Sequence, residues 1–287
     1  MNLENPARIL LAEDFSAVGQ LSTTAALPLL STFKVPLAIL PSSLLSTQSE
    51  GFGTPISLST TEWATKTLEH WKLAGIQLSG SLIGYFAEQQ FGELLLSKVT
   101  VSQRLTLLDP VMADNGCFYP AITSSHVKIL QKLLARSLFC TPNLTEACFL
   151  LNQPYVAQPT EKQLTDWLQR LQEKQLKGGK TVITGITLAE QTGCVWLEGG
   201  QLQFAMYPNL AGHFYGSGDV FAALLFGLLW QKVPWSTAIK LATFFLHDSL
   251  KSQVQLTDIQ RRFGIELGPL LVKIENFLVE KADNHNN

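Results

Sequence analysis

Short apolar segments alternate with longer amphipathic segments along most of the chain. Six apolar segments have the length and composition of buried strands: residues 8–12, 36–40, 76–79, 104–108, 137–140 and 181–183. Four segments between them repeat apolar residues at helical spacing: residues 61–73, 85–99, 123–136 and 161–175. Parallel neighbouring strands need a crossover connection, which is usually a helix. The alternation therefore predicts an α/β fold with a doubly wound, mainly parallel central sheet and helices on both faces.

The last third of the chain departs from this alternation. Residues 195–198 and 201–204 are joined by Gly199-Gly200, and a two-residue glycine turn predicts an antiparallel hairpin at one edge of the sheet. Three further helices are expected at residues 220–230, 236–251 and 270–281. Because no repeat, linker or shift in composition divides the sequence, we expect a single domain over residues 1–287.

Composition narrows the possible classes of function. Of the 287 residues, 46% are hydrophobic and only 15% are charged, and the net charge of −2 without a block of like charge argues against nucleic acid. The longest fully apolar run, residues 220–230, is shorter than a membrane span of about 20 residues. Glu4, Glu13 and Asp14 argue against a signal peptide. We therefore expect a cytoplasmic protein that binds neither nucleic acid nor a membrane.

Polar residues follow several of the predicted strands. In an open parallel sheet, ligands bind beyond the carboxyl ends of the strands, so these residues should meet at one rim. The rim would bring together carboxylate, amide and hydroxyl oxygens: Asp109, Asp114, Asn143, Glu146 and Thr184. An oxygen-rich lining of this kind suits Mg²⁺ with bound phosphates. Each residue taken alone is better explained by a turn or a helix cap than by catalysis.

The segment Gly216-Ser217-Gly218-Asp219 directly precedes the apolar helix expected at residues 220–230. Its glycines allow close approach of a ligand, and the N–H groups at the start of the helix can bind phosphate oxygens. Asp219 is open to two interpretations: a helix cap, or a carboxylate directed at a substrate hydroxyl group. The segment is not a dinucleotide-binding motif, because Phe221 occupies the place of the third glycine.

Four motifs together resemble those of the ribokinase superfamily, specifically its pyridoxal and pyridoxamine kinases. They are the segment from Asp109 to Gly116, the segment from Thr141 to Ala147, Val182-Ile183-Thr184-Gly185, and Gly216-Ser217-Gly218-Asp219. Near the start of the chain, the sequences at residues 15–28 and 40–46 are most similar to the pyridoxamine kinases of Gram-positive bacteria. The resemblance extends over nearly the whole chain and implies a ribokinase-like fold.

The resemblance also implies an activity and the residues that perform it. The chain would use ATP, Mg²⁺ and, as in some members, K⁺ to phosphorylate the 5′-hydroxymethyl group of a vitamin B6 vitamer, and it would form a homodimer. Asp219 would be the catalytic base, and Gly216, Ser217 and Gly218 would hold the transferring phosphoryl group. Asp109 and Glu146 would organise the metal. The nucleotide side would include Thr141, Asn143, Thr184, Gly185 and Asp114, and the vitamin side would include Asp14, Ser16, Ser46, Gln48 and Ser49.

The vitamin side departs from the family pattern. Relatives usually have a histidine in the segment where this chain has Thr47-Gln48-Ser49-Glu50, and Glu13 stands where glutamine is common. Ser81 stands where relatives tend to have tyrosine, which predicts the loss of an aromatic ring beside the substrate. Two alternatives therefore stay open: a kinase for another small alcohol such as hydroxymethylpyrimidine, and a vitamer-binding relative without catalytic activity.

Overall fold

A computed structural model describes residues 7–98 and 105–286, and its centre is a mainly parallel sheet. The strands of this sheet lie in the order β13 (Gln201–Pro208), β12 (Gln191–Glu198), β11 (Lys180–Leu188), β10 (Phe139–Cys140), β7 (Leu105–Leu108), β6 (Leu78–Ile83), β1 (Arg8–Ala12) and β3 (Leu37–Ile39). All neighbours from β11 to β3 pair in parallel, whereas β11, β12 and β13 pair antiparallel. The fold is the predicted ribokinase-like α/β architecture.

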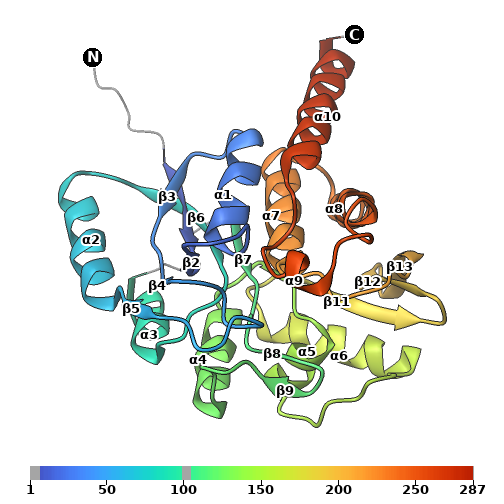
Figure 1. Cartoon of the computed structure of the whole chain (residues 1–287), viewed down its shortest axis with the longest axis horizontal. Coiled ribbons are helices and arrows are strands. Elements are labelled where there is room, and N and C mark those ends of the chain that lie inside the picture. The colour runs from blue at the N-terminus through green and yellow to red at the C-terminus, as the bar shows by residue number, and fades with distance from the viewer. Residues whose placement is uncertain (1–6, 99–104, 287) are drawn as a thin grey trace.

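Helices cover both faces of the sheet (Figure 1). One face packs against α2 (Thr61–Leu73), α3 (Gln89–Lys98), α4 (Ser124–Leu134), α5 (Leu144–Leu150) and α6 (Glu161–Lys174). The other face packs against α1 (Thr23–Thr32), α7 (Ser217–Trp230), α8 (Trp235–Lys251) and α10 (Gly268–Asn286). Strand β1 serves both layers, because Leu10 points into the first core and Ile9 and Leu11 point into the second.

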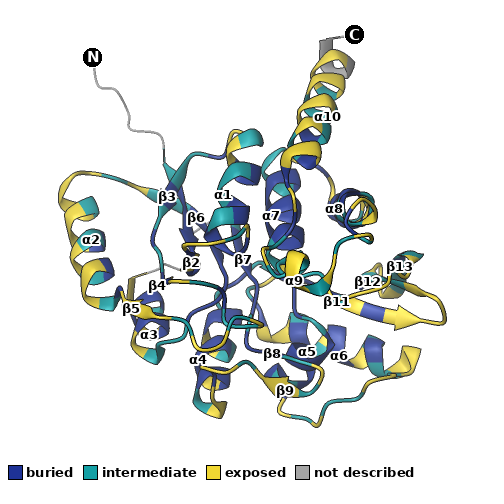
Figure 2. Cartoon of the chain, viewed as in Figure 1, coloured by how far each residue is buried: buried dark blue, intermediate teal, exposed yellow. Residues whose placement is uncertain are grey.

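Helix α7 is the most deeply buried helix of the second layer, as Figure 2 shows. Every residue of α7 from Val220 to Leu228 is buried, which explains why its sequence is apolar on all sides. Gly227 allows the ring of Phe33 to pack directly against the helix, since a Cβ atom at this position would collide with that ring. Among the described residues, no helix combines the length and apolar character needed to cross a membrane.

Most of the predicted elements are confirmed, and the differences have local causes. β1 and α2 have the predicted bounds, and β12 and β13 form the predicted edge hairpin. β6 continues beyond the predicted end at residue 79, because Gly80 lets the backbone of β7 approach closely. Helix α3 begins at Gln89 instead of residue 85, and the predicted end of this helix and Arg104 lie outside the described residues.

Helix α1 and two small sheets were not predicted. Helix α1 contains Pro28, a residue that removes a backbone donor and normally argues against a helix. The small sheets consist of β2 (Phe15–Ser16), β4 (Ser43–Leu45) and β5 (Ser57–Ser59), and of β8 (Ala113–Asp114) and β9 (Cys117–Phe118). Their strands are too short to show a period in the sequence.

Candidate active site

A cavity of about 490 Å³ lies at the carboxyl ends of the parallel strands. Residues one or two positions beyond the ends of β1, β6, β7 and β10 line it: Asp14, Tyr85, Asp109 and Thr141. Six carboxylates line this cavity, and no Lys or Arg of the described residues does so: Asp14, Glu50, Asp109, Asp114, Glu146 and Asp219. The cavity is therefore suited to cations and to ligands that arrive with them.

Asp219 lies in the first turn of α7 and lines the cavity. Gly216 caps the helix in the left-handed conformation (φ 79°), which a residue with a Cβ atom rarely adopts. The N–H of Ser217 donates to Phe214 and that of Val220 donates to Gly216. The N–H groups of Gly218 and Asp219 have no acceptor among the described residues, as expected for a helix start that binds an anion.

The carboxylate of Asp219 is held in place by the loop before α1. Its Oδ2 accepts a hydrogen bond of 2.7 Å from the backbone N–H of Ser22. Ser22 has φ 45° and ψ −127°, a strained conformation for a residue with a side chain, and such strain is concentrated at functional sites. Enclosure in the cavity raises the pKa of Asp219 to about 6, and the hydrogen bonds from Ser22 oppose this increase.

Asp109 lies close to the start of α7. Thr141 Oγ1 donates to its Oδ1 at 3.0 Å, and its Oδ2 would lie 3.9 Å from a Cβ atom placed on Gly218. Asp109 is buried, and burial followed by the charge of Asp219 raises the pKa of Asp109 to about 7. The carboxylate at the end of β7 and the helix start with free N–H groups thus lie next to each other.

Asn143 and Glu146 form the cap of α5 and use most of their polar atoms within the protein. Asn143 Oδ1 accepts from the N–H of Glu146 at 3.0 Å, and its Nδ2 donates to the carbonyl of Ala113 at 2.7 Å. Glu146 accepts from the N–H of Met112 at 3.0 Å and from that of Asn143 at 2.9 Å. Burial raises the pKa of Glu146 well above its ordinary value, with Asp109 as the next cause. Both residues line the cavity.

The remaining residues assigned to the nucleotide side also line the cavity: Thr141, Thr184, Gly185 and Asp114. The pairing of β11 with β12 is irregular between Ile183 and Ile186, and Gly185 has φ 67° there. Thr184 and Gly185 line the cavity at this irregularity. The Oδ1 of Asp114 accepts from the N–H of Asn115 at 2.8 Å.

The residues assigned to the vitamin side divide into two groups. Asp14, Gln48 and Ser49 line the cavity, whereas Ser16 and Ser46 are not among its lining residues. Ser16 is buried, and Ser46 is exposed with its Oγ accepting a hydrogen bond from the N–H of Ile56. Burial raises the pKa of Asp14 to about 7, whereas a hydrogen bond from Ser22 opposes this increase.

The prediction that an aromatic ring is lost beside the substrate is wrong. Ser81 lies inside β6 and is fully buried, away from the cavity lining. Tyr85, just beyond the end of the same strand, lines the cavity. Sequence reasoning placed residue 85 in a helix and therefore did not assign Tyr85 to the site. Burial raises the pKa of Tyr85 to about 12, so the ring keeps its hydroxyl proton at neutral pH.

A second half of the cavity was not predicted from the sequence. It lies between the edge hairpin and α8 and is lined by Thr192, Gly193, Tyr207, Asn209 and His247. The rings of His247 and Tyr207 stack with their centroids 4.8 Å apart. His247 Nε2 lies 3.0 Å from the carbonyl of Pro208. None of these residues belongs to a motif, since only the pairing of the hairpin with the sheet brings them to the cavity.

The comparisons with known proteins agree with this geometry. A family model described as phosphomethylpyrimidine kinase matches residues 56–263. The crystal structure of pyridoxal kinase from Lactobacillus plantarum is 33% identical, covers 95% of this chain and 98% of its own chain, and superposes with a TM-score of 0.88. The chain belongs to the pyridoxal and phosphomethylpyrimidine kinase family.

Further relatives are described either as pyridoxal kinases or as phosphomethylpyrimidine kinases. A structure from Bacteroides thetaiotaomicron, described as a putative phosphomethylpyrimidine kinase in a crystal form with pyridoxal, is 26% identical with a TM-score of 0.86, and the match covers 94% of this chain and 96% of that one. A protein of Caenorhabditis elegans described as a putative pyridoxal kinase is 36% identical over 124 residues, which are 41% of this chain and 36% of that protein. A similarly described protein of Schizosaccharomyces pombe is 26% identical over 53% of this chain and 46% of its own length. The chain thus spans less than half the length of these two curated relatives.

Proposed function

We propose that this chain is an ATP-dependent pyridoxal kinase, which phosphorylates the 5′-hydroxymethyl group of pyridoxal, pyridoxamine or pyridoxine in the salvage of pyridoxal 5′-phosphate. The position of Asp219 supports this function most strongly. Its carboxylate lies in the first turn of α7, beside N–H groups that are free to bind phosphate and in the same cavity as Asp109. Phosphoryl transfer depends chiefly on such positioning and on neutralising the charge of the phosphate oxygens.

In the proposed reaction, the 5′ oxygen of the vitamer attacks the γ-phosphorus of ATP. A bond forms between these two atoms, the bond from the γ-phosphorus to the bridging oxygen breaks, and ADP leaves with that electron pair. Asp219 accepts the proton of the hydroxyl group. A pKa of about 6 suits this role, because the carboxylate is ionised at neutral pH and is more basic than an ordinary aspartate. The N–H groups of Gly218 and Asp219 donate to the transferring phosphoryl group.

Asp109, Asp114 and Glu146 supply the kind of oxygen donors that Mg²⁺ prefers. Both oxygens of Glu146 already accept backbone hydrogen bonds, so this residue would hold the ion through water molecules. Among the described residues, no three His, Cys, Asp or Glu side chains are arranged to hold a metal ion by themselves, which fits an ion shared with phosphates. When bound, Mg²⁺ would neutralise charge on the phosphate oxygens. We place K⁺, as the resemblance implies, near Thr141 and Thr184.

Three further features belong to the proposal: a homodimer, a cytoplasmic location and one domain over residues 1–287. Apolar side chains exposed on and beside the small sheet of β2, β4 and β5 support self-association: Phe15, Leu44, Ile56 and Leu58. Strands from both halves of the chain share the central sheet, which supports the single domain. Sedimentation at several protein concentrations tests the dimer.

The activity is tested with pyridoxal, pyridoxamine, pyridoxine and hydroxymethylpyrimidine, each supplied with Mg·ATP while ADP formation is followed. We expect turnover of at least one B6 vitamer and loss of that turnover in Asp219→Asn. Turnover of hydroxymethylpyrimidine alone would instead support a kinase for another small alcohol. Tight binding of a vitamer without ADP formation would refute the enzymatic function.

A further inference from the structure

The loop between β4 and β5, residues 46–56, forms one wall of the cavity. At its base, the N–H of Ser46 donates to the carbonyl of Ile56 and the N–H of Ile56 donates to Ser46 Oγ, both at 2.9 Å. Gln48, Ser49 and Glu50 line the cavity from the far part of this loop. The contacts that hold this far part, the tip of the loop, therefore decide where these three side chains lie.

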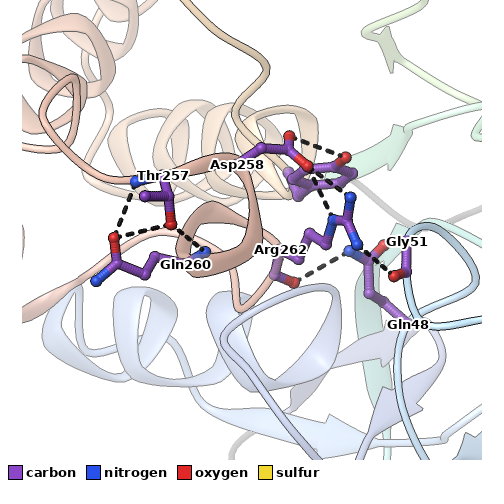
Figure 3. Close-up of polar contacts among 7 residues, drawn as sticks. Gln48, Gly51, Thr257, Asp258, Gln260 and Arg262 are labelled. Carbon is purple, nitrogen blue, oxygen red and sulfur yellow. Dashed lines mark hydrogen bonds and ion pairs between the residues drawn. The ribbon is translucent and has the colours of Figure 1, made fainter.

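All hydrogen bonds that the structure gives between residues 47–55 and the rest of the described chain go to Arg262 (Figure 3). Arg262 Nη1 donates to the carbonyl of Gly51 at 2.6 Å, and Gln48 Nε2 donates to the carbonyl of Arg262 at 3.0 Å. Gln48 Oε1 also accepts from the N–H of Glu50 at 3.3 Å. The side chain of Gln48 thus fastens the loop to residue 262.

Arg262 is held in a fixed geometry by its own segment. Asp258 Oδ2 accepts from Nε at 2.9 Å and from Nη2 at 2.7 Å, which leaves Nη1 directed at Gly51. Helix α9 (Asp258–Arg261) is capped by Thr257, whose Oγ1 accepts from the N–H of Gln260 at 3.3 Å. A guanidinium that binds a carboxylate through two nitrogen atoms is oriented more strictly than one held by a single bond.

Residues 257–263 also contact two other loops near Asp219: the loop before α7 and the loop before α1. Arg261 lies over the ring of Phe214, 5.3 Å from its centre, and Tyr215 OH lies 3.5 Å from Asp258 Oδ1. The carbonyl of Phe263 accepts from the N–H of Gln20 at 2.8 Å, two residues before the Ser22 that binds Asp219. Residues 257–263 therefore link the loop at residues 46–56 to the backbone around the catalytic carboxylate.

We infer that Arg262 is a positioning residue for the alcohol substrate: it holds the tip of the loop at residues 46–56 against the cavity, and Asp258 orients its guanidinium. Arg262 is not among the cavity-lining residues, so it acts through Gln48, Ser49 and Glu50 without touching the substrate. The inference rests on the proposed function, since it concerns the vitamer side of that site. The contact from Arg262 to Gly51 acts on this loop, whereas the N–H groups that would bind phosphate lie on α7.

The test compares Arg262→Ala and Arg262→Lys with Arg170→Ala, which removes a similar i,i+4 arginine–aspartate pair in α6. We expect Arg262→Ala to raise the KM for the vitamer about fivefold to tenfold, because loss of about 1 to 1.4 kcal/mol of loop positioning corresponds to that factor. The KM for ATP should change less than twofold, and Arg170→Ala should change neither KM. Lysine can reach Gly51 but cannot bind Asp258 through two nitrogen atoms, so Arg262→Lys should give an intermediate KM.

A readout that does not need activity follows the loop itself. A protease specific for glutamate can cut after Glu50, and the fragment ending there reports release of the loop. We expect faster cutting at Glu50 in Arg262→Ala and an unchanged rate in Arg170→Ala. An unchanged vitamer KM with unchanged cutting would overturn the inference, as would an equal rise of both KM values. Absence of turnover in the wild-type protein would refute the proposed function instead, and the cutting rate would still decide whether Arg262 holds the loop.

Discussion

The buried carboxylates of the cavity predict an unusual dependence of stability on pH. Asp14 is only 4% exposed, and burial raises its pKa from an ordinary value of 3.8 to about 7. The folded protein therefore binds a proton on Asp14 between about pH 4 and pH 7 that the unfolded chain has released. This contribution to stability is complete below the pKa of the unfolded chain, and it is lost as the pH rises through the pKa of the folded protein.

The size of the effect follows from the pKa values. Each pKa unit corresponds to about 1.4 kcal/mol, so the change at Asp14 accounts for at most about 4 kcal/mol of the free energy of unfolding. Asp109 has a pKa of about 7 and adds a contribution of the same sign. Hydrogen bonds from Ser22 and Thr141 favour the ionised carboxylates and reduce both contributions.

Urea unfolding between pH 5 and pH 8, without nucleotide and with a metal chelator, measures this dependence. We expect the free energy of unfolding to fall by a few kcal/mol as the pH rises. Asp14→Asn resembles the protonated acid, so its stability should fall less steeply and should exceed that of the wild type at pH 8. A wild-type stability that is flat or rises with pH, or a variant with the same slope, would show that these carboxylates ionise normally in the folded protein.

Three other predictions concern single residues. Asp219→Asn should lower kcat by about 10² to 10⁴ while ATP affinity, measured by calorimetry, changes little; normal turnover would exclude this carboxylate as the base. Gly227→Ala should lower the free energy of unfolding by about 1 to 3 kcal/mol, because its Cβ meets the buried ring of Phe33, whereas Gly268→Ala has open space and serves as the control in the same urea assay. Glu50→Gln should lower the kcat/KM ratio of pyridoxamine to pyridoxine about tenfold at pH 8, since the cavity would lose a negative charge that attracts a cationic amine; an unchanged ratio would rule out that charge as a determinant of vitamer choice.

The sequence predicts the layers of this fold well because periodicity is a local property. The amphipathic repeat at residues 61–73 and the apolar run at 220–230 are each set by which face of the element is buried, and that pattern is written into consecutive residues. Helix α1 was missed because Pro28 removes a donor, and burial of Ala25, Ala26 and Leu29 against α7 outweighs that local loss. Helix α1 therefore forms because of packing against a distant segment of the chain, which local sequence patterns do not reveal.

The same distinction applies to the site. Asp109 directly follows a strand and Asp219 lies in the first turn of a helix. Both places are visible in the sequence, and the rule that ligands bind at the ends of parallel strands directs attention to them. Ser22 and Tyr85 could not be found in this way, since their importance depends on a strained backbone and on the true start of α3. Arg262 is still more remote, because only the folded chain brings it to Gly51, more than 200 positions earlier.

The acidic lining of the cavity limits how a nucleotide can bind. No Lys or Arg among the described residues lines the cavity, and the dipole of α7 favours an anion by only about 0.3 to 1 kcal/mol, or about 2 kcal/mol when partly buried. The carboxylates of Asp109 and Asp219 repel a polyphosphate by a comparable or larger amount at short distance. This lining supports the proposal that a nucleoside triphosphate arrives as a complex with a divalent cation, which supplies the positive charge. Burial is the main cause of the raised pKa values of Asp14, Asp109 and Asp219, and a bound cation would favour the ionised form of the same carboxylates.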